Sequence, residues 1–246
     1  GGIMFLWINQ QGTSPETAAL LSNQNFRQAL NYGFDRSATV NAVNPGYKAY
    51  NRLVDSNFAG PGGGKFVDEY PVETAPLSGD VDQAKEYLAA AMEELGYSDV
   101  SQLPQLELIT WDTSEQKLLL KTIIDQWKQN LGLENIQLTQ YVIGTAIGSF
   151  YDLSYDLFSI TWETDVLPTD IMEAMVTGGE VNYGIWSDAQ FDALVEQAIN
   201  ELDPDKQAEL TAQAEQIFLD NEAILPLYEN GVTGAVQSYV EGFQMS

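Results

Sequence analysis

The sequence predicts an α/β fold, in which helices flank a mixed, mostly parallel sheet. Short apolar runs of strand length recur along the 246 residues and alternate with segments of helical periodicity. Two of the helical segments begin at a capping residue and end at a glycine. Because strands that alternate with helices favour parallel β-α-β units with right-handed crossovers, we expect one α/β unit over residues 1–246 rather than two linked domains.

The amino-terminal part supplies one strand, two helices and a long loop. Ile3 to Ile8 is a continuous apolar run of strand length. A helix near Asn25 follows, and Asp35 to Val43 continues it or forms a second one. In the helix near Asn25, five residues fall on one helical face: Phe26, Ala29, Leu30, Gly33 and Phe34. Residues 44–80 lose periodicity and contain a glycine-rich run at 60–64, so we expect a surface loop there.

The middle of the chain alternates between helix and strand. Asp80 and Gly96 bracket an amphipathic segment as N-cap and C-cap, and Thr113 and Gly132 bracket another. The predicted strands are Leu106 to Trp111, Ile136 to Ile143 and Tyr155 to Thr161, with a short helix over 145–151.

The carboxyl-terminal part is mainly helical. We expect a short helix over Pro168 to Val176 and a longer one that starts at a Ser187–Gln190 capping box. Asp203 followed by proline predicts the start of a further helix. Ile224 to Tyr228 and Val232 to Val236 are expected to be closing strands.

The composition of the chain excludes several classes of function. Ten basic and 36 acidic residues give a net charge of −26, which repels phosphate backbones and argues against a nucleic-acid partner. No apolar run approaches the roughly 20 residues that cross a bilayer. The first residues lack a basic n-region and a cleavage site, so we do not expect a signal peptide there.

The chain contains neither cysteine nor histidine. This composition excludes disulfides, Ser-His-Asp and Cys-His catalysis within the chain, and the usual ligands of zinc. We therefore predict a binding protein that is not an enzyme and needs no cofactor or metal.

Four segments resemble, in order, the conserved segments of one protein family. They are Phe26 to Arg36 (FRQALNYGFDR), Asp82 to Tyr97, Tyr155 to Asp165 (YDLFSITWETD), and a last one in two stretches, Asn182 to Ala198 and Ala208 to Tyr228. The family is that of the extracytoplasmic solute-binding proteins of ABC transporters, family 5 or cluster C, which serve oligopeptides, dipeptides and nickel. The order and spacing of the segments across nearly the whole chain carry the resemblance.

The resemblance implies a lobe of the type II periplasmic-binding-protein fold. Full members of the family are longer and clamp their ligand between two lobes. Residues 1–246 are accordingly expected to form the second, ligand-binding lobe, with the first lobe absent from this sequence. The implied partners are a peptide, the permease subunits of an importer and that first lobe. The implied location is the periplasm or, with a lipid anchor, the extracellular face of the cell membrane.

The candidate site lies after the third predicted strand, because ligands of α/β sheets bind at the carboxyl ends of strands. By the resemblance, Asp165 holds the α-ammonium of the peptide and Trp162 forms the wall of a side-chain pocket. The backbone of Thr161 to Glu163 is expected to pair with the peptide as an added strand. In this sequence Val166 stands where the family usually has tyrosine, and the loop is one residue shorter. The alternative interpretation makes Trp162 a core aromatic and Asp165 a helix cap.

Charge is unevenly distributed along the chain. No lysine or arginine lies between Lys128 and Lys206, whereas fourteen acidic residues do. The chain can therefore attract an ammonium group in this region but offers no local cation to a peptide carboxylate. If the receptor contacts the carboxylate of the peptide, we expect that contact to come from the first lobe.

Two other functions remain open. The ligand could be an oligosaccharide, haem or a metal chelate, as in other members of the family. Outside the family, the alternatives are an acidic surface adhesin and a hydrolase with carboxylates such as Glu163, Asp165 and Asp170. A cluster of carboxylates is expected by chance in so acidic a chain, so the hydrolase is disfavoured.

Overall fold

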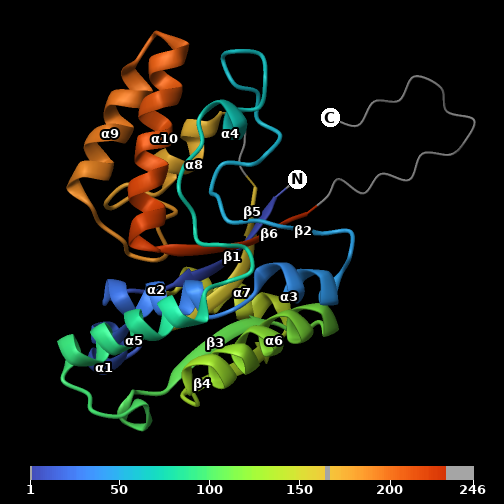
Figure 1. The fold of residues 1–246 in the computed structure, drawn as a ribbon, viewed down its shortest axis with the longest axis vertical. Helices are drawn as coiled ribbons and strands as arrows, with labels where there is room; N and C mark the ends of the chain where they lie inside the picture. Colours follow the sequence, from blue (N-terminus) through green and yellow to red (C-terminus); the bar gives the residue numbers. More distant parts are fainter. Residues whose placement is uncertain (1, 164–166, 231–246) are drawn as a thin grey trace, which may run out of the picture.

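The computed structural model describes residues 2–163 and 167–230 (Figure 1). The elements, in chain order, are β1 (Ile3–Ile8), α1 (Pro15–Leu21), α2 (Gln24–Tyr32), α3 (Arg36–Val43), β2 (Lys48–Ala49), α4 (Phe66–Glu69), α5 (Val81–Leu95), the 3-10 helix η1 (Val100–Gln102), β3 (Leu106–Trp111), α6 (Ser114–Leu131), β4 (Ile136–Tyr141), α7 (Ile143–Tyr151), β5 (Leu157–Trp162), α8 (Pro168–Ala174), α9 (Ala189–Asn200), α10 (Pro204–Asn221) and β6 (Ile224–Glu229). The predicted strand at 232–236 lies outside the described residues.

The six described strands form one mixed sheet in the order β2-β6-β1-β5-β3-β4. β3 pairs in parallel with β4 and β5, whereas β1 is antiparallel to both β5 and β6, and β2 is antiparallel to β6. The mixed sheet is confirmed, but parallel pairing is limited to the β5-β3-β4 side. The expectation of a mostly parallel sheet overlooked that β1 inserts between two strands that come much later in the chain. Periodicity identifies strands but does not identify their neighbours.

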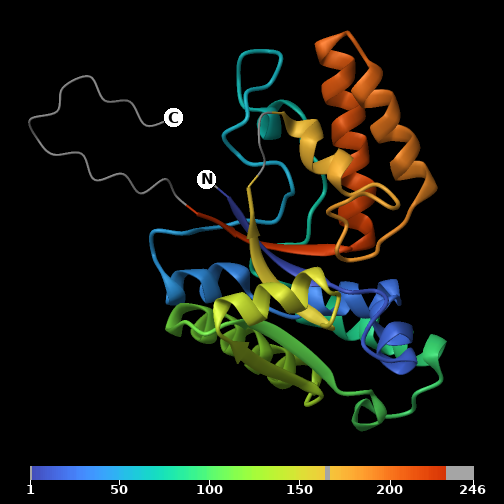
Figure 2. The same cartoon turned by 180° about the vertical axis from the view of Figure 1, so that it is seen from behind.

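Two cores lie on the two faces of the sheet. Met4, Leu6 and Ile8 of β1 belong to the first core, with apolar residues of α1, α2, α3, α5 and α6. Phe5 and Trp7 belong to the second core, with residues of α7, α8, α9 and α10. Figures 1 and 2 show α8, α9 and α10 on one side of β1 and β6, and α1, α2, α3, α5 and α6 on the other. Burial on both faces explains why β1 reads as a continuous apolar run.

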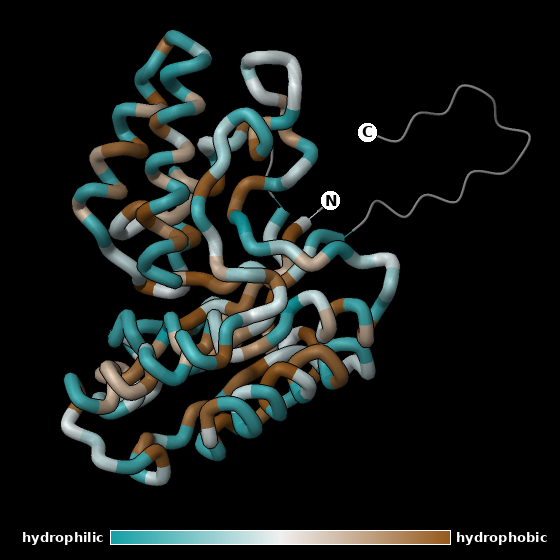
Figure 3. Tube along the Cα trace, viewed as in Figure 1, coloured by the Kyte–Doolittle hydropathy of each residue, from teal (hydrophilic) through white to brown (hydrophobic). Residues whose placement is uncertain are grey.

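The hydropathy of the chain follows this layered arrangement. Apolar stretches lie along the central strands, and polar ones predominate on the outer helices (Figure 3). Within the described part of the chain, no helix combines the length and apolarity needed to span a membrane.

Most predicted helix ends are confirmed. The Asp80 carboxylate accepts from the Gln83 amide at 3.0 Å, and Gly96 closes the same helix in the left-handed region, with φ +77°. Thr113 and Gly132 bracket α6 in the same way. Glycine suits both closing positions because a Cβ disfavours positive φ.

Two helix starts differ from the expectation. α9 is capped by Asp188, which accepts from the Phe191 amide at 2.8 Å, whereas the hydroxyl of Ser187 pairs with that of Thr177. Two adjacent residues with capping side chains make the local pattern ambiguous by one position. α1 was not expected, although Ser14 caps it and Pro15 occupies its first turn.

Several residues of the family-like segments hold the scaffold together. The buried Arg27 guanidinium donates to the carbonyls of Leu21 and Asn221, at the ends of α1 and α10. Arg36 donates to the carbonyl of Pro226 at 2.7 Å. Burial lowers the pKa of both arginines to about 10, so they stay charged at neutral pH, and Arg27 satisfies carbonyls at two helix ends.

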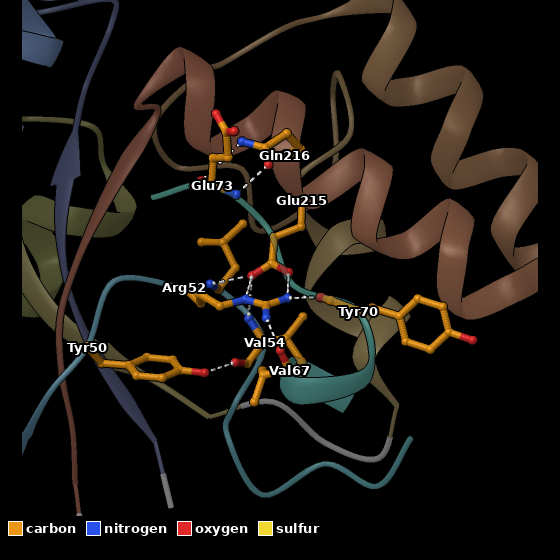
Figure 4. Close-up of polar contacts among 9 residues, drawn as sticks. Tyr50, Arg52, Val54, Val67, Tyr70, Glu73, Glu215 and Gln216 are labelled. Atoms are coloured by element: carbon orange, nitrogen blue, oxygen red, sulfur yellow. Dashed lines mark hydrogen bonds and ion pairs between the residues drawn. The ribbon is translucent and has the colours of Figure 1, made fainter. Parts of the chain in front are cut away.

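The long segment between α3 and α5 is anchored rather than loose. Arg52 forms a buried ion pair with Glu215 of α10, with 2.5 Å between Nη2 and Oε2, and also donates to the carbonyls of Val67 and Tyr70 (Figure 4). Glu215 in turn accepts from the Leu53 amide at 3.0 Å. The expected surface loop therefore has a buried inner side, which fixes its course across the sheet.

Candidate functional site

A hollow of about 690 Å³ opens at the edge of the sheet where β3, β5 and β6 end. These three strands run in the same direction, so their carboxyl ends meet there, beside the amino end of the antiparallel β1. We call it the strand-end hollow, and the residues that line it are Met4, Asn44, Tyr47, Trp111, Thr113, Glu115, Gln116, Thr161, Tyr228 and Asn230. This is the edge at which α/β sheets bind ligands.

The carboxyl end of β5 has one unpaired edge. β1 pairs with β5 as far as Trp162, but the β3 ladder reaches only Phe158. Ser159 to Trp162 therefore have a strand partner on the β1 side, and the described residues provide none on the β3 side. Unpaired amide and carbonyl groups on a strand edge can hydrogen-bond to an added strand.

Gln116 occupies the fork between β3 and β5. Its side-chain oxygen accepts from the Thr110 hydroxyl of β3 at 3.2 Å and is 3.3 Å from the Ser159 hydroxyl of β5. The residue is buried at the start of α6, which the Thr113 cap places there. Gln116 thus stabilises the separation of the two strands at the floor of the strand-end hollow. Local sequence places Gln116 only in the first turn of the helix that follows Thr113 and gives no sign of this position between two strands.

The predicted site residues fall in different places. Thr161 is half-buried and lines the strand-end hollow, where the Asn230 side chain lies 3.5 Å from its hydroxyl. Trp162 lies on the opposite face, packed on the second core with its ring centroid 6.0 Å from that of Trp7. Glu163 is exposed at the end of the strand. Asp165 lies outside the described residues.

The two ends of the described chain meet beside the hollow. The Asn230 amide donates to the carbonyl of Gly2 at 2.9 Å. Gly2 is buried, and a Cβ there would lie 2.5 Å from Cγ2 of Thr161, which only glycine avoids. β5 rises out of the sheet beside this point (Figure 2).

Aromatic side chains form one wall of the hollow. The rings of Tyr47 and Tyr228 stack, with centroids 4.6 Å apart and planes 6° from parallel. The Tyr47 hydroxyl donates to Oε1 of Glu115 at 3.0 Å. Burial raises the pKa of both tyrosines, and the nearby Glu115 carboxylate raises it further, so both phenols stay protonated at neutral pH. Tyr47 lies in the segment expected to be a loop, where periodicity gives no sign of a site.

These groups provide several kinds of contact to a bound ligand. The hollow offers a free strand edge, flat aromatic surfaces, neutral polar side chains and one carboxylate. Across residues 2–163 and 167–230, no three His, Cys, Asp or Glu side chains gather closely enough to hold a metal ion. The chemistry available is hydrogen bonding to a backbone, contact with apolar or cationic groups, and charge pairing.

Known proteins resemble the chain over most of its length. The family model of the bacterial extracellular solute-binding proteins, family 5 Middle, matches residues 1–183. The oligopeptide-binding protein OppA of Bacillus subtilis is 29% identical over 215 residues, which cover 85% of this chain and 37% of the relative. This chain thus spans well under half the length of that protein.

Solved structures share the fold. The substrate-binding domain of an oligopeptide ABC transporter from Bacillus anthracis superposes with a TM-score of 0.82 at 24% identity, covering 93% of this chain and 44% of that one. A peptide-binding protein of a peptide ABC transporter gives a TM-score of 0.78 at 22% identity and is covered over 98% of its chain. The fold of these neighbours agrees with the expected type II periplasmic-binding-protein lobe. With the family model matched over most of its residues, the chain belongs to the bacterial extracellular solute-binding proteins of family 5.

Proposed function

We propose that this chain is the second lobe of a receptor that captures peptides for an ABC importer. The observation that carries the proposal is the free edge of β5 at the strand-end hollow, where no described residue pairs as a strand with Ser159 to Trp162 on the β3 side. The peptide-binding names of the relatives support it. The first lobe belongs to the length of those relatives that this chain does not cover.

The peptide binds as an added strand along this edge. Its backbone hydrogen-bonds to that of Thr161 to Glu163, which accounts for affinity that depends little on side-chain identity. Because successive residues of a strand point to opposite faces, Thr161 and Trp162 meet alternate residues of the peptide. Trp162 forms the wall of a pocket on the second-core face, and Thr161 faces the strand-end hollow.

Asp165 takes the α-ammonium of the peptide. In the sequence Asp165 comes three positions after Trp162, the last residue of β5, so a peptide held on residues 161–163 brings its terminus toward this part of the chain. Closure of the first lobe excludes water, and a charge pair is stronger in the lower dielectric that results. The long stretch without lysine or arginine leaves such an ammonium without a competing cation from this region of the chain.

The receptor delivers its peptide to the permease subunits of the importer and performs no chemistry on it. It works outside the cytoplasm, in the periplasm or on the outer face of the cell membrane, and in the second case a lipid anchor holds the longer protein there. Release to the permease requires the two lobes to part, which exposes the backbone hydrogen bonds to water again.

The test is calorimetric titration of the full-length receptor with short peptides, together with native mass spectrometry of the receptor purified from cells. We expect peptides to co-purify and peptide binding to saturate at one site. A receptor that carries oligosaccharide, haem or a metal chelate and ignores peptides would overturn the proposal.

A further inference from the structure

The strand-end hollow contains one formal charge. Among its described lining residues, Glu115 is the one with a carboxylate side chain, and the others are aromatic, apolar or neutral and polar. The Tyr47 hydroxyl holds Oε1 of this carboxylate at 3.0 Å, and Oε2 takes no hydrogen bond from a described residue. The carboxylate is thus oriented from one side and open to a donor on the other.

The nearby lysines do not neutralise Glu115. Lys48, the neighbour of Tyr47, is paired with Glu229 at 3.1 Å, and its ammonium lies 5.0 Å from the ring centroid of Tyr50. Lys117, two positions after Glu115 on α6, does not line the hollow. A cation that enters the hollow therefore finds an oriented carboxylate without a lysine or arginine partner among the lining residues.

The aromatic wall suits the same kind of ligand. Tyr47 and Tyr228 stack beside Glu115, and Trp111 at the end of β3 also lines the hollow. Aromatic faces attract ammonium and guanidinium groups and contact the aliphatic stems that carry them. A hollow of about 690 Å³ accommodates a long side chain with its water.

Resting on the peptide-binding function proposed above, we infer that the strand-end hollow is the subsite for a cationic side chain of the bound peptide, lysine or arginine, with Glu115 as its counter-charge. Tyr47 is the positioning residue for that carboxylate. Since Thr161 faces the hollow and Trp162 faces away, the preference applies to peptide residues on the Thr161 side alone.

The experiment scans a lysine through a neutral peptide. Alanine pentapeptides with one lysine at each position are compared, by calorimetry on the full-length receptor, with peptides that carry norleucine at the same position. Norleucine keeps the apolar stem and removes the charge. We expect one position at which lysine binds roughly tenfold more tightly, the combined size of a partly exposed ion pair and a cation–π contact.

Glu115→Gln should abolish this preference and leave the norleucine peptides unaffected. Tyr47→Phe keeps the ring and loses the hydroxyl, so it should reduce the preference without removing it. The matched control is Glu93→Gln, which removes an exposed carboxylate on α5, away from the hollow, and should change nothing.

The outcomes separate this inference from the function on which it rests. Failure of all pentapeptides to bind would overturn the proposed function. Equal binding of lysine and norleucine peptides, or a preference that survives Glu115→Gln, would overturn the subsite alone. If Glu93→Gln abolishes the preference for lysine as fully as Glu115→Gln does, the preference comes from the overall acidity of the chain. This outcome would also reject the subsite.

Discussion

Thr161 and Trp162 are adjacent in β5 but lie on opposite faces of the sheet. Thr161 lines the strand-end hollow, whereas Trp162 packs 6.0 Å from Trp7 on the second core. The side chains of a peptide that pairs with the free edge of this strand would therefore contact two different surfaces. One contains Glu115, Tyr47 and Tyr228, and the other contains Trp162.

The role of Asp165 predicts a dependence on the peptide's amino terminus. Asp165→Asn in the full-length receptor should weaken binding of peptides with a free terminus by about 2 kcal/mol or more, because the ammonium loses a desolvated partner. Peptides with an acetylated terminus should be affected little, as measured by calorimetry. Asp152→Asn, an exposed residue at the end of α7, is the control. An equal loss for free and acetylated peptides would remove Asp165 from this role.

Trp162 is predicted to contribute to both binding and packing. Trp162→Ala removes a half-buried ring beside Trp7 and should destabilise the chain by about 1–2 kcal/mol in denaturant unfolding. It should also reduce peptide affinity, whereas Trp162→Phe should retain most of both. If affinity is unchanged in a folded Trp162→Ala receptor, the tryptophan belongs to the core alone.

The Arg52–Glu215 pair is predicted to hold the segment between α3 and α5 in place. Arg52→Ala leaves a buried carboxylate without its cation and should cost about 3 kcal/mol of unfolding free energy. Limited proteolysis should then cut within residues 52–72 faster than in the unchanged chain. The double variant Arg52→Met with Glu215→Leu leaves no buried charge and should be more stable than Arg52→Ala. Equal stability of the two variants would contradict this account.

Glu222 is predicted to make stability depend on pH. It is fully buried beside Arg36 and Asn31, and burial raises its pKa to about 8, well above the roughly 4.3 of an exposed glutamate. The folded chain therefore holds a proton that the unfolded chain has lost between these values. The contribution of Glu222 is present below about pH 4 and is lost as pH rises through about 8.

Denaturant unfolding between pH 5 and pH 9 measures this effect. Glu222→Gln keeps a neutral side chain that can accept a hydrogen bond from Asn31 at every pH. The unfolding free energy of the variant, relative to that of the unchanged chain, should therefore increase as pH rises. Because other groups titrate equally in both proteins, only the difference is diagnostic. A difference that is constant over this range would show that Glu222 does not change its protonation.

Local sequence was sufficient where the deciding interactions are local. Two helices begin and end as predicted: α5 at Asp80 and Gly96, and α6 at Thr113 and Gly132. A helix cap depends on a side chain and backbone groups within about four residues, so local sequence is enough to predict it. The strand over Ile3–Ile8 was recognisable because both of its faces are buried. The same logic failed by one residue at Ser187, where two capping side chains compete.

The sequence by itself determined most of the long helices and strands of this protein, its acidity and its family resemblance. Tertiary structure alone decided that β1 separates β5 from β6, that Gln116 stands between β3 and β5, and that Tyr47 reaches both Tyr228 and Glu115. Such contacts join segments that lie far apart in the chain. The energies of these contacts depend on which surfaces meet after folding. The hydrophobic periodicity of a short segment shows which of its faces is buried, but it does not identify the distant segment that this face contacts.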